Sequence, residues 1–361
     1  MDNSIGKTVL LTGVKGYIGG VLSRELVQEG YNVIGIARPV SDIKSKNLKT
    51  FIPKDKSEEK IIWEYCDIRD ECGMKLLFEK HHPNIVIHLA AIVHKKSLQA
   101  GYEDFSKTNY EASHVLFELC VAYGVETVIF TSTVEVYGNI NNSIYTWGKD
   151  KISIGTEHTL YSQGIVLDES SETLPYTDYG KTKLLAERAL EKLATPGMRY
   201  SILRLSPVYG MGFTLNLDRR IFLIKNRLLY YFGNGSYFFN FCSVNNIVLF
   251  VRRFLEQPAK NGIYNISDTE FYTARQLAES RRRERIPIIR LPLFLTYYGV
   301  KWVERAAKLF GIKSFISLYN FEKLFRCTIY SNKKALELCG KLPWNYTNTM
   351  GKELSYVEKT Y

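Results

Sequence analysis

The chain has 361 residues, of which 45% are hydrophobic and 24% charged, as is ordinary for a soluble globular protein; a disordered or low-complexity chain is excluded. Its net charge of +11 is compatible with acidic small molecules, an anionic membrane surface or nucleic acid as partners. The aromatic residues are not interleaved with basic ones as base-stacking platforms would be, and the basic run at 281–285 suits a solvated helix face. Nucleic acid is therefore not expected.

Targeting signals and cysteine usage indicate the compartment. Thr8 opens a strand-like segment with no charged and apolar leader before it, so no secretory signal is expected. Every apolar run is interrupted before the ~18 residues that a membrane-spanning helix needs. The six cysteines are scattered without C-x-x-C spacing. This pattern predicts reduced thiols, no metal cluster and a cytoplasmic protein.

Short apolar runs alternate with amphipathic stretches through the first two-thirds of the chain. The expected strands are Thr8–Thr12, Asn32–Ile36, Ile61–Tyr65, Ile85–His88, Thr127–Thr131 and Tyr200–Arg204, and the expected helices include Gly19–Glu29, Tyr110–Tyr123 and Tyr179–Leu193. The alternation predicts an α/β fold with a Rossmann-type, doubly wound parallel sheet. Ligands bind such sheets at the carboxyl ends of the strands, where we expect the site.

The later part of the chain changes character. We expect a Rossmann dinucleotide-binding domain over residues 1–205, with an inserted loop or hairpin at about 139–167, where no period is sustained. Residues 206–361 are expected to form a smaller, mostly helical substrate-binding lobe, from which about 240–265 return to the Rossmann domain. Residues 287–325 mix large apolar side chains with spaced Lys and Arg. Helices packed over the substrate site and a basic surface in peripheral contact with a membrane both fit that mixture.

A glycine-rich motif, TGVKGYIG, follows the first expected strand and opens the first helix. Glycine permits the sharp turn and lets backbone approach a pyrophosphate, and the helix N-terminus offers unpaired N–H groups to it. The motif therefore predicts a dinucleotide site. The residues expected to contact the dinucleotide here are Gly13, Lys15, Gly16, Tyr17, Ile18 and Gly19.

The second strand bears on the choice between NAD and NADP. It ends at Arg38, where an acidic residue would bind the ribose hydroxyls of NAD. Arg38 and Lys15 instead offer two cations to the additional phosphate of NADP, which is slightly favoured; alternatively, Arg38 stacks on adenine or faces solvent. Asp67, followed by Ile68, could accept a hydrogen bond from the adenine amino group. The segment Leu89-Ala90-Ala91 would let backbone lie against the cofactor.

A catalytic pair is expected on the third of these helices. Tyr179 and Lys183 are four residues apart and so share one helix face. A phenol with a pKa of ~10 is a poor base at neutral pH, and a neighbouring ammonium would bring that pKa toward neutrality. The fifth strand ends at Thr131-Ser132-Thr133, whose hydroxyls could bind the reacting oxygen and share its proton.

The order of these motifs resembles the extended short-chain dehydrogenase/reductase family, which includes sugar-nucleotide 4-epimerases, 4,6-dehydratases, decarboxylases and 4-keto-reductases. The matching segments, over roughly residues 5–275, are TGVKGYIG, CDIRD, HLAA, Asn109 in KTNYEAS, FTSTVEVYG, YGKTK with Glu187, RLSPVYG, FCSVNNIV and YNISDTE. The resemblance implies that Thr133, Tyr179 and Lys183 form the catalytic set. It also implies cofactor contacts at Asn109, Thr131, Tyr179, Lys183 and Val208.

Two departures from the family pattern narrow the reaction. The 4,6-dehydratases carry Thr-Asp-Glu where this chain has Val134 between Thr133 and Glu135, so dehydration is disfavoured, although Glu135 could still be a base. The arginine that serves decarboxylation, and that clamps the substrate diphosphate in epimerases, is replaced by Phe239, so decarboxylation is disfavoured too. Cations that could substitute for it are Lys225, Arg227 and Arg326.

The expected protein is an NAD(P)-dependent sugar-nucleotide epimerase or oxidoreductase that transfers hydride at a sugar carbon, C4 by resemblance, with Tyr179 as the acid/base. A 4-keto-sugar reductase that uses NADPH is the alternative, and a non-catalytic dinucleotide sensor is a third interpretation. The resemblance further implies a nucleotide-sugar substrate, a role in polysaccharide biosynthesis and a homodimer.

Overall fold

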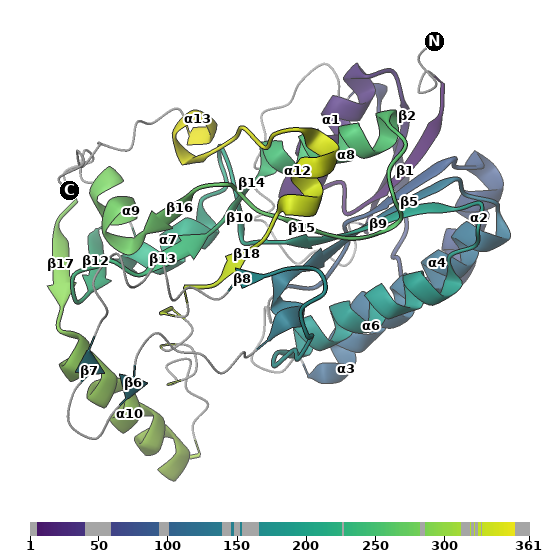
Figure 1. The fold of residues 1–361 in the computed structure, drawn as a ribbon. Coiled ribbons are helices and arrows are strands. Elements are labelled where there is room, and N and C mark those ends of the chain that lie inside the picture. Colours follow the sequence, from purple (N-terminus) through teal and green to yellow (C-terminus); the bar gives the residue numbers. More distant parts are fainter. Residues whose placement is uncertain are drawn as a thin grey trace.

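The computed structural model describes residues 6–39, 59–93, 101–138, 146–147, 152–153, 166–225, 227–281, 286–311, 318, 321, 324–325 and 327–350. A seven-stranded sheet in the order β15-β9-β5-β4-β1-β2-β3 forms the centre (Figure 1). Every neighbouring pair of strands in it is parallel. Its strands are β1 Thr8–Thr12, β2 Asn32–Ala37, β3 Ile62–Tyr65, β4 Ile85–His88, β5 Thr127–Thr133, β9 Arg199–Leu205 and β15 Gly262–Ile266.

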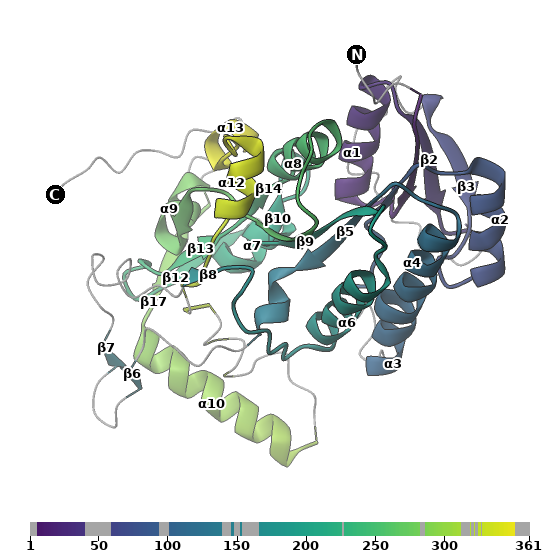
Figure 2. The same cartoon turned by 45° about the vertical axis from the view of Figure 1, so that its right-hand side comes forward.

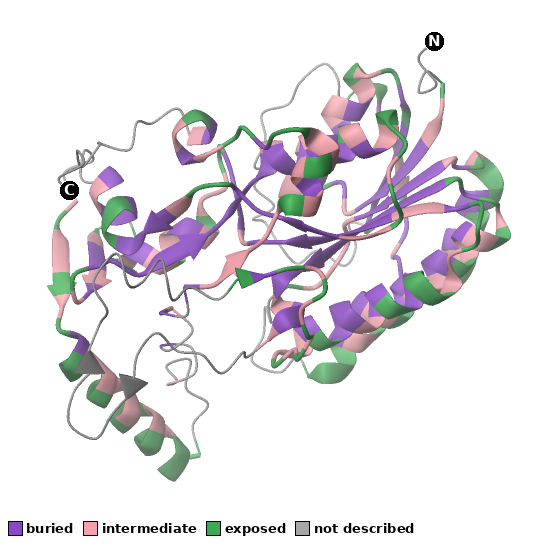
Figure 3. Ribbon diagram, in the orientation of Figure 1, coloured by how far each residue is buried: buried purple, intermediate pink, exposed green. Residues whose placement is uncertain are grey.

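This sheet confirms the predicted Rossmann-type parallel fold. Each strand expected from the sequence is present, with ends that differ from the expected ones by at most two residues. The central strands β4 and β5 are buried along their whole length, as expected of a sheet covered on both faces. Purple ribbon along the middle of the sheet in Figure 3 marks this burial.

Helices cover both faces of the sheet, and each face has its own apolar core (Figure 2). Val9 and Leu11 of β1 belong to the core under α1 and α8, whereas Leu10 points into the core under α2, α4 and α6. This alternation follows from the two-residue period of a strand. The helices of this part are α1 Tyr17–Gln28, α2 Glu71–His81, α3 Tyr102–Phe105, α4 Ala112–Ala122 preceded by the π-helical turn Ser106–Glu111, α6 Asp178–Leu193, α8 Val244–Glu256 and α12 Lys333–Cys339.

The smaller lobe is built on a third core, rich in aromatic side chains such as Phe232, Tyr237 and Phe325. Short sheets accompany its helices: β10 Val208–Tyr209 with β14 Cys242–Ser243, β12 Leu228–Phe232 between β11 Phe222–Ile224 and β17 Ile288–Leu291, and β13 Phe238–Asn240 with β16 Phe271–Thr273. Its helices are α7 Leu215–Ile221, α9 Ala274–Ser280, α10 Leu293–Leu309 and α13 Tyr346–Met350. After β14 the chain returns to the large sheet, where α8 lies beside α1 and β15 pairs with β9.

Most of the insertion expected at 139–167 lies outside the described residues. Its described parts are the short antiparallel pair β6 Thr146–Trp147 and β7 Ile152–Ser153, and β8 Val166–Leu167, which pairs with β18 Ile329–Tyr330. Arg281, expected on a solvated face, is instead buried and forms an ion pair with Asp218 at 3.6 Å. Within the described residues, no helix combines the length and the apolar character needed to cross a bilayer.

Candidate active site

The glycine loop between β1 and α1 brings backbone against backbone. Gly13 has φ of +74°, and a Cβ there would lie 2.8 Å from the amide nitrogen of Ala90. A Cβ on Gly19 would lie 2.3 Å from the carbonyl oxygen of Gly13. Gly16 occupies the N-cap of α1 and has no side chain with which to cap it. The N–H groups of the first turn of α1 are therefore available to an anion, and the loop fits a dinucleotide pyrophosphate.

A chain of buried hydrogen bonds supports this loop from behind. The amide of Ala90 donates to Thr12 Oγ1 at 3.2 Å, and Thr12 Oγ1 lies 2.6 Å from His88 Nδ1. On the other side, His88 Nε2 lies 2.8 Å from Ser113 Oγ, which itself donates to the carbonyl of Asn109 at 2.9 Å. Because the Ser113 proton is already used, Ser113 accepts from His88 Nε2, and Nδ1 accepts from Thr12. Burial lowers the pKa of His88 to about 3, which keeps the ring neutral.

Asn109 and Thr131, both expected at the cofactor, hold the loop that follows β4. The Asn109 side chain accepts from the Ile92 amide at 2.8 Å and donates to the Ile92 carbonyl at 2.9 Å. Thr131 Oγ1 donates to the carbonyl of His88 at 3.1 Å. Both side chains therefore bind backbone on either side of Leu89–Ala91, which fixes the segment that faces Gly13.

Charged residues gather at the ends of β2 and β3. The Lys15 ammonium lies 4.9 Å from the centre of the Tyr65 ring, and Arg38 is exposed. Asp67 binds Arg69 at 2.7 Å, and this contact, with a smaller contribution from Arg38, holds the pKa of Asp67 below its ordinary value. The Asp67 carboxylate is thus ionised and already engaged by Arg69.

Tyr17 connects the glycine loop to the smaller lobe. Its hydroxyl donates to the Met211 carbonyl at 3.1 Å, and its ring stacks on Phe213 at 4.7 Å. Burial raises the pKa of Tyr17 to about 12. The other apolar residues expected at the cofactor are buried or half-buried: Ile18, Ile68, Leu89 and Val208.

The reactive side chains converge where β5 ends and α6 begins. Thr133 is the last residue of β5, and Tyr179 and Lys183 lie on α6. Burial raises the pKa of Tyr179 above its ordinary value, the Glu135 carboxylate raises it further, and a hydrogen bond with Thr133 opposes both. The phenol is therefore protonated at neutral pH in the protein alone.

Glu135 is fixed beside this tyrosine. Its amide donates to Thr133 Oγ1 at 3.2 Å, and its carboxylate accepts from Thr177 Oγ1 at 3.1 Å. Thr177 is also the N-cap of α6, where it accepts from the Gly180 amide at 3.0 Å. Val134, at the position where dehydratases carry an acid, is buried in an apolar cluster.

Lys183 is almost fully buried, with 1% of its surface exposed. Its ammonium lies 3.9 Å from the centre of the Phe130 ring. Burial lowers the pKa of Lys183 to about 7, although the nearby Glu187 carboxylate raises it. The side chain can therefore gain or lose a proton close to neutral pH.

We expect the stability of the protein to rise between pH 7 and pH 10 because of Lys183. The unfolded lysine keeps its ordinary pKa of 10.5 and the folded one has a pKa of about 7, so the unfolded state binds more protons over this interval. If the full pKa shift holds, the free energy of unfolding rises by about 5 kcal/mol across this interval. Urea unfolding of wild type and Lys183→Met across this range measures it: the variant should be more stable at pH 7, and its advantage should shrink as the pH rises. A stability difference between wild type and Lys183→Met that stays constant with pH would contradict the lowered pKa of Lys183. Lys181→Met, an exposed position on α6, is the control.

A cation that the sequence did not single out lies over the substituted position Phe239. The Arg220 guanidinium of α7 lies 5.3 Å from the centre of the Phe239 ring and 5.1 Å from that of Phe241. It donates to the Asn216 carbonyl at 2.5 Å. Burial lowers the pKa of Arg220 to about 10, while the Glu135 carboxylate is among the groups that raise it. Of the substitutes expected from the sequence, Lys225 and Arg227 are exposed and Arg326 lies outside the described residues.

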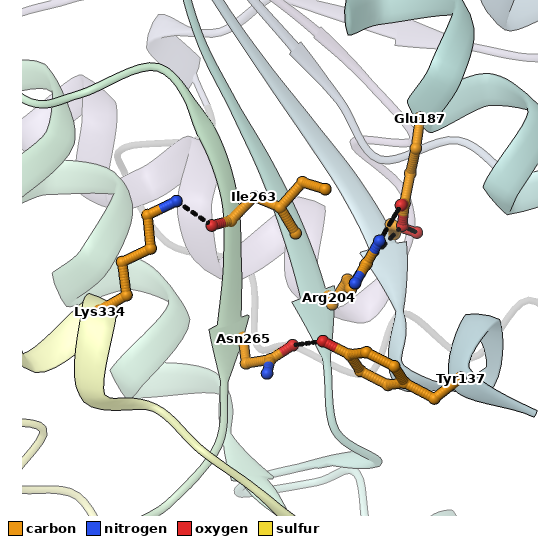
Figure 4. A network of polar contacts seen from close by, with 7 residues as sticks. Tyr137, Glu187, Arg204, Ile263, Asn265 and Lys334 are labelled. Carbon is orange, nitrogen blue, oxygen red and sulfur yellow. Dashed lines mark hydrogen bonds and ion pairs between the residues drawn. The ribbon is translucent and has the colours of Figure 1, made fainter. Parts of the chain in front are cut away.

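A buried ion pair connects α6 to the large sheet (Figure 4). Arg204 of β9 binds Glu187 of α6 at 2.7 Å, and the Ser132 hydroxyl donates to the same carboxylate. The Arg204 guanidinium lies 4.8 Å from the centre of the Tyr137 ring, whose hydroxyl donates to Asn265 Oδ1 at 2.7 Å. This network links β5, α6, β9 and β15. Its Glu187 lies on α6 one helical turn after Lys183.

The fold and the site define a Rossmann-type protein with a glycine cradle and a Tyr-x-x-x-Lys pair. Residues 9–267 match the NAD dependent epimerase/dehydratase family, and the chain belongs to this family. A UDP-glucose 4-epimerase of Rhizobium leguminosarum bv. trifolii is 27% identical over 209 residues, which cover 58% of this chain and 54% of that protein. A dTDP-D-glucose 4,6-dehydratase of Bos taurus is 29% identical over 286 residues, which cover 77% of this chain and 72% of that protein. The chain thus spans about half of the first relative.

Solved structures show the same fold over nearly the whole chain. A UDP-glucose 4-epimerase of Thermotoga maritima with UDP-glucose has a TM-score of 0.61 and 24% identity, covering 94% of this chain and 93% of its own. A UDP-glucuronic acid 4-epimerase of Bacillus cereus in complex with NAD has a TM-score of 0.65 and 19% identity, covering 98% of this chain and 97% of its own. At these identities the likeness establishes the fold.

Proposed function

We propose that the protein is an NAD(P)-dependent sugar-nucleotide epimerase that oxidises and re-reduces one sugar carbon, with C4 as the carbon and Tyr179 as the acid/base. The observation that supports it most is the Tyr179 phenol, hydrogen-bonded to Thr133 and one helical turn from the buried Lys183. Thr133 ends β5 of the same parallel sheet that carries the glycine loop, and α6 packs against β5. The relatives named as 4-epimerases support the choice of reaction and carbon.

The chain's own residues supply proton transfer and positioning. Tyr179 exchanges a proton with the sugar hydroxyl, and Thr133 hydrogen-bonds the same oxygen. The Lys183 ammonium, one helical turn along α6, would stabilise the phenolate. The Glu135 carboxylate raises the pKa of the phenol and so makes its phenolate a stronger base. The nicotinamide, when bound, supplies the acceptor and donor of hydride. The cradle that would hold its dinucleotide is formed by the glycine loop, with the Leu89–Ala91 segment behind it.

Dehydration is not proposed, because the required acid is missing beside Glu135. Val134 occupies that position and is buried among apolar side chains. Glu135 itself stays next to Tyr179, where its charge acts on the pKa of the phenol. Its proposed role is to tune the acid/base rather than to eliminate water.

A 4-keto-sugar reductase that uses NADPH is the second candidate. Lys15 and Arg38 favour it, since both cations lie near the end of β2 and β3, where NADP carries its additional phosphate. The same two residues are the reason for proposing NADP above NAD as the cofactor. A sensor without chemistry is disfavoured, because it would not need the phenol and ammonium pair.

The released cofactor distinguishes the two reactions. The protein is purified without added cofactor and denatured, and any dinucleotide set free is identified and quantified by mass spectrometry. Near-stoichiometric dinucleotide is expected for an epimerase, which recycles its cofactor in place. If the released dinucleotide is NAD, the preference for NADP inferred from Lys15 and Arg38 is overturned. A protein free of dinucleotide that binds NADPH more tightly than NADH would replace the epimerase by the reductase.

A further inference from the structure

Helix α10 carries an apolar face that is open to solvent. Phe294, Tyr298, Trp302 and Leu309 lie four, four and seven residues apart, so they share one side of the helix, and Leu295 flanks them. Their exposed fractions are 59% for Phe294, 67% for Leu295, 42% for Tyr298, 71% for Trp302 and 85% for Leu309. An apolar patch of this kind on a protein surface marks an interaction site. We call these five residues the α10 face.

The helix is attached to the lobe through a different side. Leu293 is buried in the aromatic core, and Tyr297 and Val300 pack against it. These residues lie between about a third and a half of a turn away from the centre of the α10 face at 100° per residue. The helix therefore docks through one apolar edge and presents a second one outward. Figures 1 and 2 show α10 projecting from the body, and Figure 3 colours it mostly exposed or intermediate.

Positive charge runs beside the α10 face. Lys301, Arg305 and Lys308 lie along one of its edges. The Lys308 side chain is 77% exposed, and its ammonium lies 3.6 Å from the Glu304 carboxylate in a pair that water screens. The only acidic residue in the helix is Glu304, which points toward the lobe, where it accepts from the Leu318 amide at 3.2 Å. The whole chain has a net charge of +11. An aromatic and aliphatic stripe with cations at its edge matches an anionic lipid surface, with the rings at the level of the headgroups.

We propose that α10 lies flat in the surface of an anionic membrane, with the α10 face among the lipids and the three cations at the headgroups. The contact is peripheral and involves about 25 Å of helix, from 1.5 Å per residue. A second copy of the chain fits less well, because an antiparallel two-fold contact through this face would bring the same basic edges of both helices together. The inference is independent of the reaction that the site performs.

Vesicle binding by the full-length protein tests the proposal. Co-sedimentation is compared for vesicles of phosphatidylcholine alone and of phosphatidylcholine mixed with phosphatidylglycerol. We expect binding at least tenfold tighter to the anionic vesicles, and weaker binding as salt is added. Leu295→Ser/Trp302→Ser and Lys301→Gln/Arg305→Gln/Lys308→Gln should each weaken it at least tenfold. Leu76→Ser on α2, where Leu76 is 64% exposed, should bind as wild type does.

Thermal unfolding of the variants shows whether the lost binding is a loss of fold; it should be unchanged, since the substituted side chains are exposed apart from the half-buried Lys301. Failure of the wild type to bind anionic vesicles, or binding that both α10 variants retain, overturns the proposal. A second outcome also overturns it: no vesicle binding, together with a dimer in light scattering that Leu295→Ser/Trp302→Ser converts to a monomer. The α10 face would then join two copies of the chain.

Discussion

Tyr179→Phe is expected to lower kcat by about 10³-fold, within the ~10²–10⁴ range that general acid–base catalysis contributes. The substitution removes one oxygen, the one that Thr133 hydrogen-bonds and that would exchange a proton with the sugar. The ring keeps its volume on α6, so the fold and the dinucleotide site are unaffected. Conversion of a UDP-sugar to its C4 epimer, followed by chromatography of the products, gives kcat and KM for wild type and variant.

Tyr176→Phe is the matched control for this experiment. Tyr176 lies just before α6 and is 58% exposed, so its hydroxyl can be removed near the site without touching the proposed acid/base. It should keep the wild-type kcat. A Tyr179→Phe enzyme with kcat within tenfold of wild type would show that another group moves the proton. A variant that loses both turnover and bound dinucleotide would point to a positioning role for Tyr179 instead.

The features that the sequence predicted well are local in the chain. Six of the seven strands of the large sheet are short, largely apolar runs whose bounds can be read without knowing their neighbours, whereas β15 Gly262–Ile266 is not among the expected strands. The glycine motif and the Tyr179–Lys183 spacing each lie on one turn or one helix, so the residue types and their separation suffice to place them. The parallel order of the strands then brings these motifs to one edge of the sheet.

The features that could not be read from the sequence depend on contacts between distant residues. Arg220 reaches Phe239 only because α7 packs on the aromatic core of the smaller lobe. Strand β12 in that lobe finds its parallel partner β17 about sixty residues later, and neither strand has a strong pattern of its own. Short strands of this kind are not distinguishable from helical or loop segments by period alone.

Three hydroxyls at the end of β5 illustrate the same limit. Thr131, Ser132 and Thr133 are adjacent and chemically alike, and the sequence treats them as one cluster. In the structure they have different hydrogen-bond partners: the His88 carbonyl for Thr131, Glu187 for Ser132 and Tyr179 for Thr133. Strand alternation points neighbours to opposite faces, but the partner on each face is set by other elements.

Arg204→Met is expected to destabilise the protein by about 3–5 kcal/mol, the range typical for removing one partner of a buried ion pair. Arg204 and Glu187 are 3% and 1% exposed in their side chains, so water cannot replace the lost guanidinium. The Glu187 carboxylate would keep only the Ser132 hydroxyl among these partners. Chemical denaturation followed by fluorescence, under conditions where unfolding is reversible, gives the free energy of unfolding of each variant.

The double variant Arg204→Met/Glu187→Met separates the cost of an unpaired charge from the value of the pair. It removes both charges at once and should recover most of the lost stability. Lys7→Met provides the surface comparison: Lys7 binds Glu126 at 2.6 Å, as short as the buried contact, but the two side chains are 36% and 50% exposed. Water screens that pair, so its loss should cost no more than ~1 kcal/mol. If Arg204→Met proved as mild as Lys7→Met, the buried pair would not be what holds α6, with Tyr179 and Lys183, against the sheet.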